Sequence, residues 1–310
     1  MSFLFVLLFF AVPKPSIRAQ GAAAPAAPAA PAGGSVPDTG SDCDTNSNKG
    51  YSYTGTFNGN VTVSAGQTCI FEGGGVNGNV HENGGDVELH GSQVTGNVQA
   101  TGGNLIVDSS TTVTKNVQIS GAVTFAIGTG SIIDGNLQIQ NETVPPAAPA
   151  APAAPAAPAA PAAPAAPADS PAPAGGGSAP PARRACTGVT YQICGITVQG
   201  NLQFQNNAIL LVQIYDSTIN ANLQSQNNSA EIDIEDNTVA GNLEVSNNNA
   251  DTTVNSNTVN GNLQDQNNTS SDQTPANVDS NVVGKNLQCE NNTPGTSSSN
   301  NTVGRNNQCY

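Results

Sequence analysis

The chain has 310 residues, a formal net charge of −14 and an isoelectric point near 4.1. This acidity argues against nucleic acid and anionic bilayers as partners, because binding to either depends mainly on Lys and Arg. Only 4% of the residues are aromatic and none is Trp, which argues against a wide globular core. A solenoid, whose narrow core is renewed in every coil, suits this composition better.

The start of the chain predicts a signal peptide over residues 1–20. Its apolar run, residues 3–12, is too short to span a bilayer and is typical of a secretion signal. Lys14 and Arg18 follow this run, whereas signal peptides usually carry their basic residues before it. We therefore expect a secreted or cell-surface protein with no integral membrane span in the mature chain.

Segments rich in Pro and Ala divide the rest of the chain. Residues 21–42 and 145–185 contain runs of Pro-Ala-Ala triplets, which favour extended polyproline II over packed structure. We predict that both segments are disordered and that the second is a spacer. The spacer separates two repeat segments, residues 43–144 and 186–310.

The repeat in both segments is marked by an Asn that usually follows Gly and precedes Val or Leu. We call these residues the anchors: Asn60, Asn79, Asn97, Asn116 and Asn136, then Asn201, Asn222, Asn242, Asn262, Asn286 and Asn306. Their separations are 19, 18, 19 and 20 residues in the first segment and 21, 20, 20, 24 and 20 in the second. Such a period predicts a repeat architecture.

Short strands flank each anchor in the predicted coil. An apolar residue stands three positions before every anchor, and Val or Leu stands one position after it except at Asn307. The residues that follow alternate as in a half-buried strand, with Gln often facing solvent. A corner pair comes next, rich in Gly in the first segment and Asn-Asn in the second. Both residue types enter positive φ readily, and stacked Asn side chains can hydrogen-bond from coil to coil.

These features predict an all-β fold, a parallel β-helix or β-solenoid with coils of about 20 residues stacked about 4.8 Å apart. The last coil of the first segment, residues 135–141, closely matches the first coil of the second, residues 200–206. This match would let the segments stack end to end with the spacer looped out. Cysteines at the start of the second segment favour an independent cap instead, and the sequence leaves both arrangements open.

The six cysteines, none in a Cys-x-x-Cys spacing, predict disulfides rather than metal or redox sites. Cys289 and Cys309 each follow an anchor by three residues, so they share a column on adjacent coils. The coil spacing lies within the Cα range that a disulfide accepts, which predicts a bridge that closes the last coil. We also predict Cys43–Cys69 and Cys186–Cys194 at the starts of the two segments.

Catalytic chemistry has few candidates in this sequence. His81 and His90 fall on outward phases of strands on different sides of one coil, so we interpret them as solvated and expect no metal or cofactor. Asp216 and Asp236 each lie six residues before an anchor and should stack in neighbouring coils, where a carboxylate pair could act in catalysis or hold a cation. The simpler interpretation is an acidic, solvated face. Asp265 falls in the inward column, and the sequence offers no reason for it.

A column of threonines is a candidate recognition face. It comprises Thr218, Thr238, Thr258 and Thr302, each four residues before an anchor, and is interrupted by Val282. A flat Thr array can bind ice or a crystalline polymer. The simpler interpretation is that β-branched residues are ordinary on the solvent face of a strand.

The Gly-Asn-Val and Gly-Asn-Leu-Gln coils, with the ending at residues 286–294, resemble secreted bacterial parallel β-helix repeat proteins of unassigned function. They more distantly resemble bactofilin-type solenoids, which polymerise end to end. We expect a non-enzymatic secreted or cell-surface structural or adhesion-type protein, with cell-envelope or extracellular polysaccharide as its partner. The alternatives are a polysaccharide-active lyase or hydrolase that uses Asp216 and Asp236, and a solenoid that self-assembles end to end.

Overall fold

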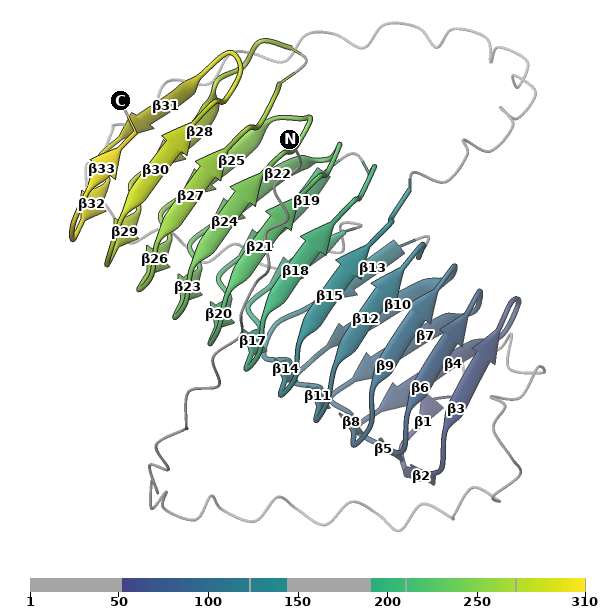
Figure 1. The fold of residues 1–310 in the computed structure, drawn as a ribbon. Coiled ribbons are helices and arrows are strands. Elements are labelled where there is room, and N and C mark those ends of the chain that lie inside the picture. Colours follow the sequence, from purple (N-terminus) through teal and green to yellow (C-terminus); the bar gives the residue numbers. More distant parts are fainter. Residues whose placement is uncertain (1–51, 123, 144–190, 210, 271, 310) are drawn as a thin grey trace, which may run out of the picture. The chain divides into compact units, whose positions relative to one another are not determined.

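The computed structural model describes residues 52–122, 124–143, 191–209, 211–270 and 272–309. In these ranges the chain forms 33 strands and no helix. The strands belong to three parallel sheets of eleven strands each, and consecutive strands of the chain enter the three sheets in turn (Figure 1). This arrangement confirms the predicted all-β parallel solenoid with coils of about 20 residues.

Sheet A holds the strand that follows each anchor. It comprises β3 (Val61–Ser64), β6 (Val80–Asn83), β9 (Val98–Thr101), β12 (Val117–Ser120), β15 (Leu137–Gln140), β18 (Leu202–Gln205), β21 (Leu223–Gln226), β24 (Leu243–Ser246), β27 (Leu263–Gln266), β30 (Leu287–Glu290) and β33 (Asn307–Gln308).

Sheet B comes after sheet A along the chain. It comprises β1 (Ser52–Tyr53), β4 (Thr68–Glu72), β7 (Asp86–His90), β10 (Asn104–Asp108), β13 (Thr124–Ile127), β16 (Gln192–Cys194), β19 (Leu211–Tyr215), β22 (Glu231–Glu235), β25 (Thr252–Asn255), β28 (Ala276–Asp279) and β31 (Thr296–Ser299).

Sheet C precedes each anchor and is built from short strands. It comprises β2 (Thr56–Asn58), β5 (Gly75–Asn77), β8 (Gln93–Val94), β11 (Thr112–Val113), β14 (Ile132–Ile133), β17 (Thr197–Val198), β20 (Thr218–Ile219), β23 (Thr238–Val239), β26 (Thr258–Val259), β29 (Val282–Val283) and β32 (Thr302–Val303).

The core is a column of aliphatic side chains inside the three sheets. In one coil, Val239 of sheet C, Leu243 and Val245 of sheet A, and Val254 of sheet B are all buried. Alternate residues of each strand face outward, as the period-2 pattern predicts. The apolar residue before each anchor and the Val or Leu after it are therefore core residues.

The described residues on the two sides of the spacer stack as one continuous solenoid. β15 pairs with β18 in register, from Leu137 opposite Leu202 to Gln140 opposite Gln205. Pairing of β13 with β16 and of β14 with β17 continues the other two sheets. The structure therefore shows the stacked arrangement. The alternative, in which the second segment begins independently of the first, is wrong.

The predicted bridge between Cys289 and Cys309 is confirmed, with 4.7 Å between the two Cα atoms. Cys69 and Cys194 are also disulfide-bonded. Their predicted partners, Cys43 and Cys186, lie outside the described residues. The predicted signal peptide and both Pro-Ala segments lie outside them as well.

Candidate functional site

Each anchor Asn lies at the corner where the chain passes from sheet C to sheet A. The backbone N–H and Nδ2 of Asn79 donate to Oδ1 of Asn60, one coil earlier, at 2.9 and 3.1 Å. The same two bonds, 2.8 and 3.2 Å long, join Asn201 to Asn136 across the spacer. A carboxamide both donates and accepts, so one residue type can bond the coils before and after it. The ladder therefore accounts for the Asn at every anchor.

The Asn-Asn pair after each strand of sheet A forms the next corner in the second segment. Its first residue takes positive φ, as predicted, with values of 56° at Asn227 and 56° at Asn247. Its second residue is buried and extends a second ladder, in which the N–H and Nδ2 of Asn228 both donate to Oδ1 of Asn248 at 3.0 Å. The first segment has Gly at the same corner, with φ of 85° at Gly84.

A third ladder, which was not predicted from the sequence, lies at the corner from sheet B to sheet C. The N–H and Nδ2 of Asn237 donate to Oδ1 of Asn257 at 3.0 and 3.1 Å, and Asn257 donates in the same way to Asn281. Asn281 continues the ladder to Asn301. The signal was present, because an Asn stands five residues before the anchor in four consecutive coils.

In the first segment, a buried carboxylate lies at the corner from sheet A to sheet B, where the second segment has its buried Asn ladder. Oε1 of Glu82 accepts the N–H of Gly84 at 2.5 Å, and Oε2 accepts the N–H of Thr101 at 2.8 Å. Burial raises the pKa of Glu82, although the backbone donors around it lower it in part. A Cβ atom at Gly103 would lie 1.8 Å from the carbonyl oxygen of Gly85 and 2.3 Å from Oε1 of Glu82, so this corner needs glycine.

A second buried carboxylate, Glu142, lies at the junction of the two segments. Its N–H donates to Oδ1 of Asn207 at 2.8 Å, which joins it to the buried Asn ladder. Neither of its carboxylate oxygens has a hydrogen-bond partner among the described residues. Burial raises its pKa to about 7; the amides of Gly121 and Ala122 lower it in part but do not reach hydrogen-bonding geometry.

The structure explains Asp265, which the sequence could not. This residue is fully buried in the inward column of sheet A, between Val245 and Cys289. Its carboxylate accepts hydrogen bonds from Nδ2 of Asn268 at 2.8 Å and from Nδ2 of Asn292 at 2.6 Å. Burial raises the pKa of Asp265 to about 7, against the lowering effect of these two amides.

The outer face of sheet A carries mostly neutral polar side chains, and we call it the amide face. Each strand contributes two outward positions, except the two-residue β33, which contributes one. The first position holds Thr62, His81, Gln99, Gln118, Gln138, Gln203, Gln224, Glu244, Gln264, Gln288 and Gln308; the second holds Ser64, Asn83, Thr101, Ser120, Gln140, Gln205, Gln226, Ser246, Gln266 and Glu290. Neighbouring amides are bonded along the axis, as in Gln99 to Gln118 at 2.9 Å and Gln264 to Gln288 at 2.8 Å.

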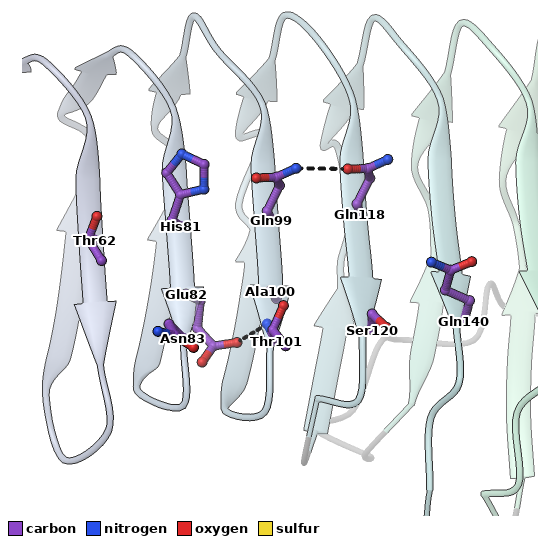
Figure 2. Close-up of a pocket in the computed structure, with 10 residues that line it drawn as sticks. All are labelled: Thr62, His81, Glu82, Asn83, Gln99, Ala100, Thr101, Gln118, Ser120 and Gln140. Carbon is purple, nitrogen blue, oxygen red and sulfur yellow. Dashed lines mark hydrogen bonds between the residues drawn. The ribbon is translucent and has the colours of Figure 1, made fainter.

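The amide face is hollowed over its first five strands (Figure 2). The hollow has a volume of about 490 Å³, and it forms where the second outward position holds the short side chains Asn83, Thr101 and Ser120. Gln140 lies at the end towards the second segment. A smaller hollow of about 200 Å³, lined by anchor Asn and Gln side chains from Asn116 to Gln203, continues across the junction of the segments.

Charge is distributed unevenly over the three outer faces. The strands of sheet B carry eight acidic residues: Glu72, Asp86, Glu88, Asp108, Glu231, Asp233, Glu235 and Asp279. The amide face carries two outward acids, Glu244 and Glu290. The three cations among the described residues, Lys115, Lys285 and Arg305, each stand directly before an anchor, at the corner next to the amide face. Sheet B is therefore an acidic face, and the amide face is nearly neutral.

The two histidines lie on different sheets, as predicted. His81 is on the amide face, and His90 is on sheet B. Nδ1 of His90 lies 2.5 Å from Asp108, and Nε2 lies 3.0 Å from Glu88. Burial opposes the charged form of His90, but the contacts with Glu88 and Asp108 outweigh it and raise the pKa.

The carboxylates of the enzyme hypothesis lie on adjacent coils at the corner from sheet B to sheet C. Asp216 and Asp236 take positive φ of 52° and 55°. The N–H of Asp216 donates to the carbonyl oxygen of Glu235 at 3.3 Å, which continues the ladder of sheet B. The same corner holds Ser256 in the next coil, with φ of 56°. Asp tolerates this backbone conformation better than most residues, which gives both aspartates a structural reason for their positions.

The threonine column lies on the outer face of sheet C and is longer than predicted. In-register pairing joins Thr112, Ile132, Thr197, Thr218, Thr238, Thr258, Val282 and Thr302. Ile132 and Val282 are 37% and 49% exposed. From Thr112 to Thr302 the common property of the column is therefore β-branching rather than a hydroxyl group, which suits the solvent face of a strand. Before Thr112 the same pairing continues to Gln93 and Gly75, which are not β-branched.

Among the residues that the structure describes, no group of three or more His, Cys, Asp or Glu side chains is arranged to hold a metal ion. None of the described segments forms a helix long and apolar enough to cross a membrane. Comparison of the chain with protein-family models, with curated proteins and with solved structures finds no match.

Proposed function

We propose that this protein is a non-enzymatic structural or adhesion-type protein, secreted or held at the cell surface, that presents its solenoid as a rigid binding surface. The observation that supports the proposal is the unbroken register of all three sheets through the junction of the segments. Side chains on each outer face are therefore held at regular intervals along the axis.

The Asn ladders add to this rigidity. Each rung bonds one coil to the next through side chains as well as backbone, and fully satisfied buried networks of this kind hold a structure in one arrangement. The partner that best suits a surface of repeated, fixed groups is itself repetitive. An envelope or extracellular polysaccharide meets this description.

The test is binding of the labelled protein to whole cells and isolated envelopes over a range of protein concentrations. We expect saturable binding that survives moderate salt, because the amide face is nearly neutral and does not rely on ion pairing. The control is Ile119→Asp, which places a charge in the core of the first segment and should abolish both the packing of these coils and the binding. Binding that does not saturate, or that the Ile119→Asp variant retains, would contradict the proposal.

A further inference from the structure

The hollow on the amide face has the chemistry of a site for hydroxyl groups. Amide and hydroxyl side chains dominate its lining, with Gln99, Gln118 and Thr101 near its middle. Each carboxamide has two N–H donors and an oxygen with two lone pairs. The bond from Gln99 to Gln118 uses one donor and one lone pair, so both amides keep further groups for a ligand.

The same bond holds the two amides in place before any ligand arrives. Gln99 and Gln118 occupy equivalent positions on neighbouring strands, and their 2.9 Å bond fixes the orientation of both side chains. Ordering a free Gln side chain on binding costs free energy, so a surface ordered in advance binds more tightly for the same contacts.

Charge decides between classes of polymer. Glu82 is the one carboxylate in the lining, and both of its oxygens already accept backbone N–H groups of Gly84 and Thr101. The neighbouring sheet B is acidic, and the whole chain carries a net charge of −14. An anionic polymer would be repelled, whereas a neutral one would not.

The direction of the hollow fits an extended chain. Its lining residues come from five successive strands, from Thr62 on β3 to Gln140 on β15, so it runs along the solenoid axis (Figure 2). Equivalent side chains recur about every 4.8 Å along this direction. This spacing is comparable to the length of one sugar ring.

We propose that this hollow binds an extended, neutral polysaccharide chain that lies along the solenoid axis, held by the carboxamides of Gln99 and Gln118. The inference rests on the proposed function and names the chemical class of the partner. The second hollow, which shares Gln118 and crosses the junction of the segments, lengthens the same track.

The test compares binding of the full chain to insoluble neutral glucan and chitin with binding to gels of anionic pectate and alginate. We expect saturable binding to a neutral polymer and none to the anionic ones. The double variant Gln99→Ala/Gln118→Ala should bind about tenfold more weakly, because it loses both carboxamides. The matched control is Gln264→Ala/Gln288→Ala, which removes an equivalent bonded pair outside both hollows and should bind as the wild type does.

The outcomes separate this inference from the proposed function. Cell binding that persists in Gln99→Ala/Gln118→Ala, with no neutral polymer bound, would overturn the hollow as the site and leave the adhesion role standing. Preferred binding to pectate or alginate would overturn the choice of a neutral ligand. Concentration-dependent association of the protein that the double variant abolishes would assign the face to a second copy of the chain. No binding to cells or to any polymer would overturn both proposals.

Discussion

The Oδ2 atom of Asp265 accepts a 2.6 Å hydrogen bond from Nδ2 of Asn292, a residue one coil further along the solenoid. Its Oδ1 atom accepts a 2.8 Å hydrogen bond from Nδ2 of Asn268. In the preceding coil, Nδ2 of Asn248 donates instead to the next rung of the ladder. Asp265 therefore diverts the Nδ2 donor of Asn268 from the next rung, while Oδ1 of Asn268 still accepts from Asn248, at a position where the coil before has Val245.

Replacing Asp265 with Val should stabilise the protein above neutral pH. Burial raises the pKa of Asp265 from 3.8 to about 7, so its favourable contribution is complete below pH 3.8 and is lost as the pH rises to about 7. We expect Asp265→Val to be more stable than wild type at pH 8 by about 2–4 kcal/mol in urea unfolding, and the difference to shrink towards pH 4. A variant that is less stable at pH 8 would show that the carboxylate is needed in its charged form.

Glu142 offers an independent test of the same physics at the junction of the segments. Its pKa is raised from 4.5 to about 7 by burial, so stability should fall between these pH values as the unpartnered carboxylate ionises. Glu142→Gln cannot ionise, and we expect it to remove about 3 kcal/mol of this pH-dependent loss. The control is Glu244→Gln, which makes the same substitution on the outer face of sheet A and leaves Glu142 in place. Identical pH profiles for wild type and Glu142→Gln would contradict the assignment.

The buried Asn ladder should contribute more to stability than the exposed one. Asn228 is buried and bonds to Asn207, Asn248 and the carbonyl oxygen of Phe204, so Asn228→Ala leaves several buried groups unsatisfied. We expect a loss of about 2–3 kcal/mol, measured by hydrogen exchange of the flanking coils because repeat proteins often unfold in parts. Water can replace the bonds of the exposed anchor Asn242, so Asn242→Ala should cost about 1 kcal/mol or less. Equal losses would contradict a role for burial.

Substitutions of Asp216 distinguish a turn-forming role of this residue from a catalytic role. Its φ of 52° lies in the left-handed region, so Asp216→Gly should be tolerated and Asp216→Val should destabilise by about 1–2 kcal/mol in thermal unfolding. Asp216→Asn keeps the turn and removes the charge. We expect Asp216→Asn to leave both stability and binding unchanged. Polysaccharide cleavage by the wild type that Asp216→Asn abolishes would instead support the enzyme hypothesis.

The fold was predictable because every coil repeats the same local sequence pattern. Anchor spacing, the period-2 alternation and the Gly or Asn corners each involve residues close in sequence, and the Cys289–Cys309 bridge follows from column position alone. The spacer separates the two segments in the sequence, so the stacked and the independent arrangements both stayed open. The match between residues 135–141 and 200–206 was the one sequence feature that pointed to stacking.

The candidate site was less predictable because it depends on neighbours in other coils. Asp265 is explained by Asn292, which lies beyond the lengthened 24-residue repeat. The hollow exists because Asn83, Thr101 and Ser120 coincide on successive strands, and their short length matters only beside longer neighbours. Sequence alternation assigns each of these residues to the outer face but says nothing about the depth of that face.

The Cys289–Cys309 bridge should protect the last coil and no other. It joins β30 to the segment that follows β33, at the end of the stack where strands have a neighbour on one side alone. In a repeat protein, stability is passed between adjacent coils, so a bridge at the end limits fraying there. We expect Cys289→Ser/Cys309→Ser to exchange amide hydrogens faster in β31, β32 and β33.

Coils near the middle of the stack, such as β18 to β21, serve as the internal control and should exchange at the wild-type rate, because they lie far from the bridge. The variant also leaves intact the described disulfide-bonded cysteines Cys69 and Cys194. Mass spectrometry of peptides after timed exchange would make the comparison. Faster exchange throughout the solenoid would show that the coils unfold together, and the picture of a bridge with a local effect would then be wrong.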